Sequence, residues 1–113
     1  MTLTEKPWGS ELLLEKNDKY AFKKLFMKAG HKCSLQYHKQ KHETIFVVSG
    51  RLKVTYGQPD DTLVEKEMGP GDSMAINPGM IHRMAGIEDS VYLEASTPEL
   101  DDVVRINDEY GRV

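Results

Sequence analysis

The chain has 113 residues and a mass of 12.8 kDa, the size of one small domain, with no room for a second. Its 15 Lys and Arg against 18 Asp and Glu give a net charge of −3, which argues against nonspecific nucleic-acid binding. The longest apolar run, residues 45–48, is too short for a membrane span, and the first fifteen residues lack a signal-peptide core. The single cysteine, Cys33, cannot form an internal disulfide, as is usual in a reducing compartment. We therefore expect a soluble cytoplasmic domain that binds neither nucleic acid nor membrane.

Short segments of strand character follow one another along most of the chain. In chain order they are residues 10–15, 20–29, 34–38, 44–49, 51–56, 62–68, 73–76, 81–86 and 90–96. Gly50 separates two of them and predicts a tight hairpin with a positive φ. The acidic segment 98–113 differs, and we expect it to form a short helix or a strap. Turn signals roughly every eight to twelve residues predict an all-β barrel or sandwich.

Four polar side chains have spacings that suit a metal site: Gln36, His38, Glu43 and His82. Gln36 and His38 are two residues apart, so on a strand they point to the same face. A bend between residues 39 and 42 would return Glu43 to the same cavity, and a turn at residues 77–79 would bring His82 from another strand. Two nitrogen and two oxygen donors suit one divalent ion such as Zn, Mn, Fe, Co or Ni. A lone histidine on a strand is more often structural, so the prediction depends on the combination.

The glycines around these residues supply that combination. The spacing of Gly30, Gln36, His38, Glu43 and Gly50 resembles the first motif of the cupin superfamily, with Gln in place of its first His. Residues 71–82, GDSMAINPGMIH, resemble the second motif, with Asn77 where the family usually has Pro. The resemblance implies a single-domain cupin over residues 1–113, a small jelly-roll β-barrel with a short C-terminal tail or helix. It also implies one divalent metal ion inside the barrel, bound by three or four of the side chains Gln36, His38, Glu43 and His82.

A narrower resemblance extends from about residue 6 to residue 112. The segments KPWG (6–9), SLQYH (34–38), ETIFVVSG (43–50), IHR (81–83) and DDVVRINDEYGR (101–112) are similar to the type II mannose-6-phosphate isomerase domain. That domain usually forms the C-terminal part of bifunctional mannose-1-phosphate guanylyltransferases. The nucleotidyltransferase domain does not fit in 113 residues, so we expect no guanylyltransferase activity from this chain. Gln40 and Thr44 replace two histidines of the family pattern and Lys41 replaces an arginine, which bears on the substrate and on catalysis.

The resemblance implies isomerisation of mannose 6-phosphate to fructose 6-phosphate through an enediol, with a sugar phosphate as the small-molecule partner. Such a reaction needs a proton-transferring group and cations for the phosphate. We take as candidate catalytic residues Lys24, Lys41, Glu94 and Arg112, and as candidate substrate-binding residues Arg83, Arg105, Arg112 and His42. The alternatives are a sugar-binding or sensory cupin without activity, and another metal-dependent enzyme such as an epimerase or dioxygenase. We expect a homodimer, because small cupins commonly pair and exposed sheet edges favour pairing.

Overall fold

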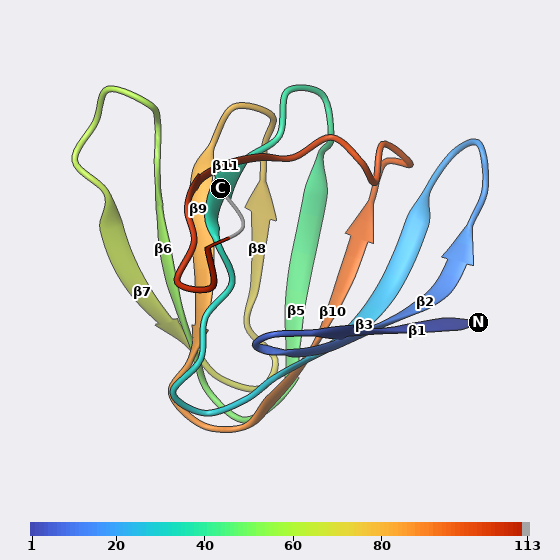
Figure 1. The fold of residues 1–113 in the computed structure, drawn as a ribbon, viewed down its shortest axis with the longest axis horizontal. Coiled ribbons are helices and arrows are strands. Elements are labelled where there is room, and N and C mark those ends of the chain that lie inside the picture. Colours follow the sequence, from blue (N-terminus) through green and yellow to red (C-terminus); the bar gives the residue numbers. More distant parts are fainter. Residues whose placement is uncertain (112–113) are drawn as a thin grey trace.

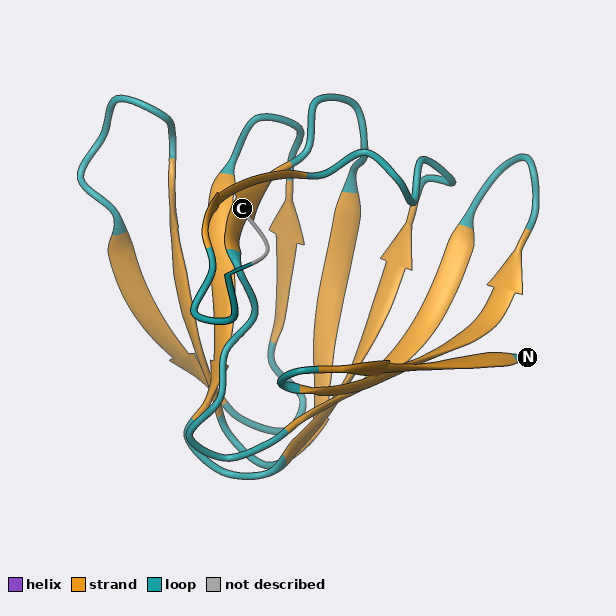
Figure 2. Cartoon of the chain, in the orientation of Figure 1, coloured by secondary structure: helices purple, strands orange, loops and turns teal. Residues whose placement is uncertain are grey.

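Two antiparallel sheets facing each other make up the computed structural model, which describes residues 1–111 (Figures 1 and 2). The strands are β1 (Thr2–Lys6), β2 (Gly9–Lys16), β3 (Ala21–Met27), β4 (Leu35–Tyr37), β5 (Glu43–Ser49), β6 (Leu52–Gly57), β7 (Val64–Met68), β8 (Ser73–Ile76), β9 (Ile81–Gly86), β10 (Ser90–Ser96) and β11 (Val104–Asn107). The predicted all-β jelly roll is confirmed, and each predicted strand is present with small changes at its ends. Two further strands, β1 and β11, were not predicted.

The order of the strands brings distant parts of the chain together. The six-stranded sheet runs β1-β2-β3-β10-β5-β8 and the five-stranded sheet runs β11-β4-β9-β6-β7. In the second sheet β4 lies between β9 and β11, so that Gln36 is opposite His82 on one side and Arg105 on the other. Residues from the middle and the C-terminal part of the sequence therefore meet around β4.

Alternation along the strands separates an interior from an outer surface. In β5 the side chains of Glu43, Ile45 and Val47 are buried and the intervening ones are exposed. In β6 the buried residues are Leu52 and Val54, which lie on one face of the strand. The interior side chains form one core, which consists of Trp8, Leu25, Met27, Cys33, Ile45, Val47, Leu52, Val54, Met68, Ile76, Met84 and Tyr92. Burial of this apolar surface is the main stabilising contribution to the fold.

The acidic C-terminal segment forms a strap against the five-stranded sheet. After residue 97 the chain crosses above the open end of the sheets and continues into β11, which pairs with β4 (Figure 1). Of the two forms expected for this segment, the strap is the one present, and residues 1–111 contain no helix. Within this range there is accordingly no helix long and apolar enough to cross a membrane.

Gly50 makes the hairpin between β5 and β6 with a φ of 84°, as the sequence predicted. A Cβ at this position would approach the backbone of Asp89 and lie 2.7 Å from the Cα of Ser90. We expect Gly50→Ala to lower the free energy of unfolding by about 2–4 kcal/mol, because a left-handed backbone and a steric clash both oppose the side chain. Urea unfolding followed by circular dichroism measures this loss.

Gly71 provides a matched control for that substitution. Its φ of 90° is equally unfavourable for a side chain, but a Cβ there has no neighbouring atom within 4 Å. Gly71→Ala should therefore lose only the conformational part, about 1–2 kcal/mol. Equal losses in the two variants would contradict the close approach of the Asp89–Ser90 backbone to Gly50.

Candidate metal centre and cavity

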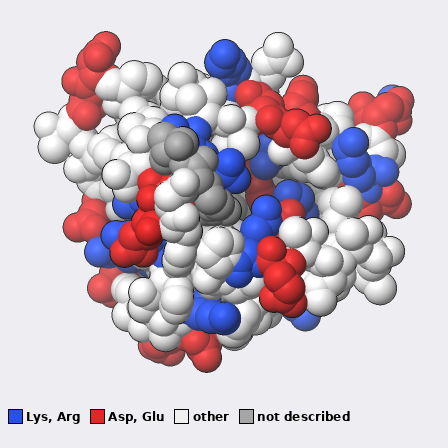
Figure 3. Space-filling view, viewed as in Figure 1, with Lys and Arg blue, Asp and Glu red and all other residues white. Residues whose placement is uncertain are grey.

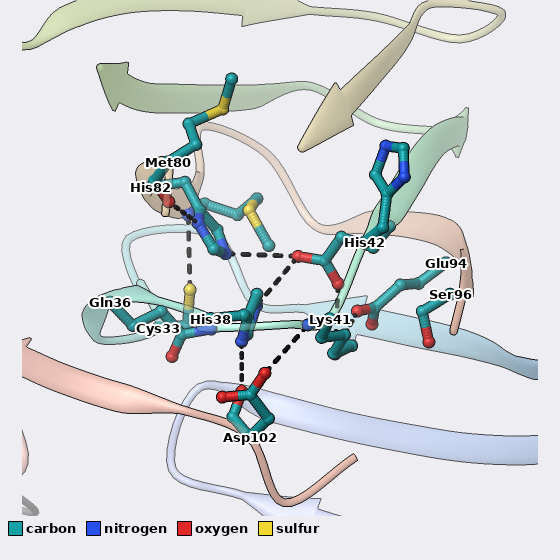
Figure 4. Close-up of polar contacts among 12 residues, drawn as sticks. Cys33, Gln36, His38, Lys41, His42, Met80, His82, Glu94, Ser96 and Asp102 are labelled. Carbon is teal, nitrogen blue, oxygen red and sulfur yellow. Dashed lines mark hydrogen bonds and ion pairs between the residues drawn. The ribbon is translucent and has the colours of Figure 1, made fainter. Parts of the chain in front are cut away.

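Three buried side chains converge between the two sheets. His38 directly follows β4, Glu43 begins β5 and His82 lies near the start of β9. Nε2 of His38 is 3.3 Å from Oε1 of Glu43, and Nε2 of His82 is 3.2 Å from the same oxygen (Figure 4). The exposed fractions of the three residues are 3%, 2% and 0%, respectively, and one ligand atom from each lies within 4.8 Å of the others. The predicted return of Glu43 to the cavity of His38 is thus present in the structure.

The hydrogen bonds of the two imidazoles fix which nitrogen faces Glu43 as an acceptor. Nδ1 of His38 is 2.6 Å from the backbone oxygen of Asp102, and Nδ1 of His82 is 3.0 Å from that of Met80. A carbonyl oxygen only accepts, so each Nδ1 carries a proton and donates it, and in the neutral ring Nε2 has the lone pair. This is the usual outer hydrogen-bond pattern of metal-binding histidines.

The lone pairs of two imidazole nitrogens and one carboxylate oxygen face one another at this point, which favours a cation between them. Two Nε2 atoms and Oε1 of Glu43 are all acceptors when the rings are neutral, and a cation between them would offset their mutual repulsion. Among the described residues, Nε2 of His82 is also buried without a hydrogen-bond partner, whereas Oε2 of Glu43 faces Nζ of Lys41 at 3.2 Å. Two imidazoles and a carboxylate suit a borderline divalent metal ion. The three residues therefore fit the metal ion that the sequence predicted.

A buried lysine connects this centre to a second carboxylate. Nζ of Lys41 is 3.2 Å from Oε2 of Glu43 and 3.0 Å from Oε1 of Glu94. Burial alone would raise the pKa of the Glu43 carboxyl. In the absence of a metal ion, hydrogen bonds that His38 and His82 donate when Nε2 carries a proton, together with the charge of Lys41, hold that pKa well below its usual range. Glu43 is therefore ionised, and the line Glu43–Lys41–Glu94 carries alternating charges into the cavity.

Asp102 in the C-terminal strap holds the bend between His38 and Glu43. Its carboxylate accepts hydrogen bonds from the backbone N–H groups of Lys39, Gln40 and Lys41 at 3.0, 2.6 and 2.9 Å (Figure 4 shows Asp102 beside His38 and Lys41). These bonds lower the pKa of Asp102 to about 2. Asp102 was not among the predicted site residues, because nothing in its local sequence distinguishes it from the neighbouring acids.

The metal centre opens into a cavity of about 340 Å³ between the sheets and the strap. Apolar side chains of the core, including Trp8, Leu25 and Tyr92, form part of its wall. The charged part of the wall includes Lys6, Glu11, Lys23, Lys41, Glu43, Glu94, Asp101 and Arg105. In Figure 3 basic and acidic side chains lie side by side around the hollow near the middle of this face. A cavity of this size and polarity suits a small, highly polar ligand.

Arg105 contributes a donor that no described residue uses. It lies on β11, lines the cavity, and has a buried Nε without a hydrogen-bond partner in the part of the chain that the structure describes. A buried N–H without an acceptor is costly, and guanidinium groups match the oxygens of phosphate and carboxylate groups. The position of Arg105 therefore fits an anionic group in the cavity.

Several candidate residues lie at or near the cavity and others do not. Gln36 lines it next to His82 in register, but its Oε1 accepts a hydrogen bond from Ser34, and its part in metal binding stays a prediction. Lys41 and Glu94 lie in the cavity wall, as described above. Lys24 is exposed on the opposite face of β3, where it follows the inward-facing Lys23. Lys24 therefore cannot act in this cavity without a change of strand register.

Two further candidates face away from the cavity, and a third is outside the described range. His42 is exposed and borders a separate groove on the outer side of β3, β5 and β10. Arg83 follows the inward-facing His82 and points outward, where it donates to the carbonyls of Cys33 and Asn107 at 2.9 and 3.2 Å. Arg112 lies outside the described residues. Of the candidate arginines in residues 1–111, Arg105 is thus the one at the cavity.

The side chain of Cys33 is buried and belongs to the cavity wall. Strand alternation counted back from Gln36 would place the thiol on the far side, but β4 begins only at Leu35 and the chain before it is not a regular strand. The sulfur accepts a hydrogen bond from the backbone N–H of Met84 at 3.3 Å. Burial raises the pKa of this thiol, and the bond from Met84 and the charge of Arg83 offset only part of that rise.

We expect native Cys33 to resist alkylation by iodoacetamide at neutral pH, since the reactive thiolate is disfavoured and shielded. Mass spectrometry of the intact protein should show slow modification in buffer and rapid modification in urea. Similar rates in the two conditions would contradict a buried, protonated thiol.

Comparisons with known proteins agree with this architecture. A family model described as a cupin domain matches residues 25–96. A mannose-1-phosphate guanylyltransferase of Escherichia coli K12 is 34% identical over 114 aligned residues, which cover 96% of this chain and 23% of that protein. The chain thus spans less than a quarter of this relative. The homology to mannose-1-phosphate guanylyltransferases that the sequence predicted is confirmed over nearly the whole chain.

Solved structures show the same fold at low sequence identity. The capsular polysaccharide assembling protein CapF of Staphylococcus aureus has a TM-score of 0.83 at 20% identity, covering 94% of this chain and 31% of that one. An oxalate decarboxylase of Bacillus subtilis has a TM-score of 0.81 at 18% identity, covering 94% and 30%, respectively. The family model matches more than half of the chain, and the protein therefore belongs to the cupin domain family.

Proposed function

We propose that this protein is a metal-dependent isomerase of sugar phosphates, acting on mannose 6-phosphate and fructose 6-phosphate. The observation that carries the proposal is that His38 and Glu43, which form a buried cluster with His82, line one cavity together with Glu94 and Arg105, whose Nε has no hydrogen-bond partner among the described residues. The resemblance to type II mannose-6-phosphate isomerase domains and the homology to mannose-1-phosphate guanylyltransferases support the substrate class. The Mn(II) centers of the oxalate decarboxylase with the same fold support metal binding.

The cations of the cavity wall are suited to orient the substrate. Arg105 would donate a hydrogen bond from its Nε–H, which has no partner among the described residues, to a phosphate oxygen. Lys6 also lines the cavity, and its 3.9 Å contact with Glu11 is loose. The phosphate would then lie at the β11 side of the cavity and the reacting carbons toward Glu94. A divalent ion held by His38, Glu43 and His82 would supply Lewis-acid polarisation of the substrate oxygens.

Glu94 is the candidate base that the geometry favours. In the forward direction a proton leaves C2 to a carboxylate oxygen of Glu94 and returns to C1, while the proton of the C2 hydroxyl passes to O1. One C–H bond breaks and one forms, so no external oxidant or reductant is needed. Lys41 holds Oε1 of Glu94 at 3.0 Å and thereby orients the carboxylate. Such proton transfer typically contributes 10²–10⁴-fold to the rate.

The test is a coupled assay of fructose 6-phosphate formation from mannose 6-phosphate, with protein loaded in turn with Zn, Mn, Fe, Co and Ni. We expect Glu94→Gln to lower kcat by about 10²–10⁴-fold and Arg105→Met chiefly to raise KM. Glu65→Gln is the matched control, since Glu65 is exposed on β7 and should keep full activity. Absence of turnover with all five metals would overturn the isomerase proposal.

One contact favours a second candidate, a cupin that binds a sugar phosphate without converting it. Lys41 pairs with Glu94 directly, and a carboxylate held by an ammonium group is a weaker base. Gln40 and Thr44, which replace family histidines, are both exposed and do not line the cavity, so they do not separate the two candidates. Saturable calorimetric binding of mannose 6-phosphate without turnover would identify the binding protein. The expected pairing of two copies stays a prediction.

A further inference from the structure

The contact between the C-terminal strap and His38 joins two parts of the chain that are 64 residues apart. Asp102 forms this contact through its backbone oxygen, which accepts a hydrogen bond from Nδ1 of His38. Its carboxylate accepts three more, from the successive N–H groups of residues 39–41. These four hydrogen bonds connect the strap both to a metal ligand and to the bend that leads to the next one, Glu43.

We propose that Asp102 is a positioning residue of the metal centre, which fixes the bend with its carboxylate and the ring of His38 with its carbonyl oxygen. The inference rests on the proposed metal binding. With the bend fixed, Nε2 of His38 and Oε1 of Glu43 are held 3.3 Å apart and face the same point as Nε2 of His82. Without the hydrogen bonds of the carboxylate, the strap is not held against the bend. The backbone oxygen of Asp102 is then no longer fixed opposite Nδ1 of His38, and the ring can take either tautomer or turn.

The arrangement of donors explains why this position needs a carboxylate. Oδ2 accepts from the N–H groups of Gln40 and Lys41, and Oδ1 accepts from that of Lys39. Asparagine would place an NH₂ group against at least one N–H, and alanine would leave all three N–H groups without this acceptor. Asp102→Asn is therefore a close-to-isosteric change that removes the acceptor for part of the bend.

The tautomer of His38 gives a direct test that needs neither metal nor substrate. Long-range ¹⁵N–¹H spectra in mildly alkaline buffer should show both His38 and His82 protonated at Nδ1 in the metal-free wild type. In Asp102→Ala the backbone oxygen remains, but the strap loses all three hydrogen bonds to the bend, so we expect this oxygen to move away from Nδ1 and His38 to become a mixture of tautomers. His82 should stay unchanged, because its partner is the carbonyl oxygen of Met80, and so it serves as an internal control. A His38 that keeps the Nδ1 proton in the variant would overturn the proposal.

Metal affinity provides the second readout. Titration of metal-free protein with Co²⁺, followed by visible absorption and by calorimetry, should show a Kd raised roughly tenfold or more in Asp102→Asn and Asp102→Ala, as for other outer hydrogen-bond partners of metal ligands. Asp89→Asn is the matched control: its carboxylate also accepts a backbone N–H, that of Ala29 at 2.8 Å across 60 residues, but neither residue lines the cavity. Thermal melting of the three variants measures their losses of stability, so that their Kd values for Co²⁺ are compared between variants of similar stability.

The outcomes separate the two proposals. A raised Kd in the Asp102 variants and an unchanged Kd in Asp89→Asn would support the positioning role. Equal Kd values in all variants would overturn it and leave the metal site intact. If the wild type binds no Co²⁺, the proposed function fails, and the tautomer measurement still decides whether Asp102 orients His38.

Discussion

His82→Ala is expected to abolish stable metal binding. The substitution removes one of three ligand side chains, and the remaining Nε2 of His38 and carboxylate of Glu43 leave an open coordination position next to a buried charge. The loss should exceed the 10–100-fold that is typical when only an outer hydrogen-bond partner is removed. Metal content after dialysis against Zn²⁺ should fall from one ion per chain to nearly none. In the same samples, Zn²⁺ should raise the Tm of the wild type but not that of the variant.

His42→Ala is the control, because His42 is exposed and borders the outer groove rather than the cavity. The variant also replaces a histidine, at the position before Glu43, and its metal content should stay at one ion per chain. Loss of metal in both variants would point to a general effect of losing a histidine, and metal retained in both would show that His82 is not a ligand.

Lys41→Met should give a large loss of stability for the removal of a single charge. Lys41 is buried between Glu43 and Glu94, and methionine keeps most of its aliphatic part while removing the charge. Removing one partner of a buried ion pair leaves an uncompensated charge and typically costs about 3–5 kcal/mol. Urea unfolding in metal-free buffer measures this change, since a bound cation would replace part of the missing positive charge.

Lys53→Met separates burial from the mere presence of an ion pair. Nζ of Lys53 is 2.9 Å from Glu65, as close as the pairs of Lys41, but both side chains are largely exposed. Such exposed pairs contribute about 0–1 kcal/mol, so this variant should unfold at nearly the wild-type urea concentration. Similar small losses in the two variants would mean that the charges around Lys41 are better solvated than their burial indicates.

Most of the strands and the cluster of His38, Glu43 and His82 could be predicted from the sequence, because both depend on regular spacing. Alternation identified β6, β-branched and aromatic residues identified β5, and the two cupin motifs predicted that His38, Glu43 and His82 share one cavity. The same alternation would have excluded three other candidates. Lys24, His42 and Arg83 each neighbour a residue that faces inward, namely Lys23, Glu43 and His82, so each must face outward on a regular strand.

The elements that were missed have no such regularity. β1 is polar and exposed along most of its length, so it has no buried face to reveal it, and its role comes from pairing with β2. Asp102 is one of several acids in the tail, and its importance comes from N–H groups more than sixty residues earlier. Contacts of this kind depend on the tertiary fold, and a pattern in a single sequence does not show them.

The pairing of β4 with both β9 and β11 also sets when the site can exist during folding. His38 and Glu43 lie in the first half of the chain, whereas His82 and Asp102 are synthesised later, and all four meet only after strands from distant regions have paired. Such long-range pairing forms late and slowly compared with local structure. A nascent chain therefore assembles the proposed metal site only near the end of folding. The ion would then stabilise the finished fold rather than guide its first steps.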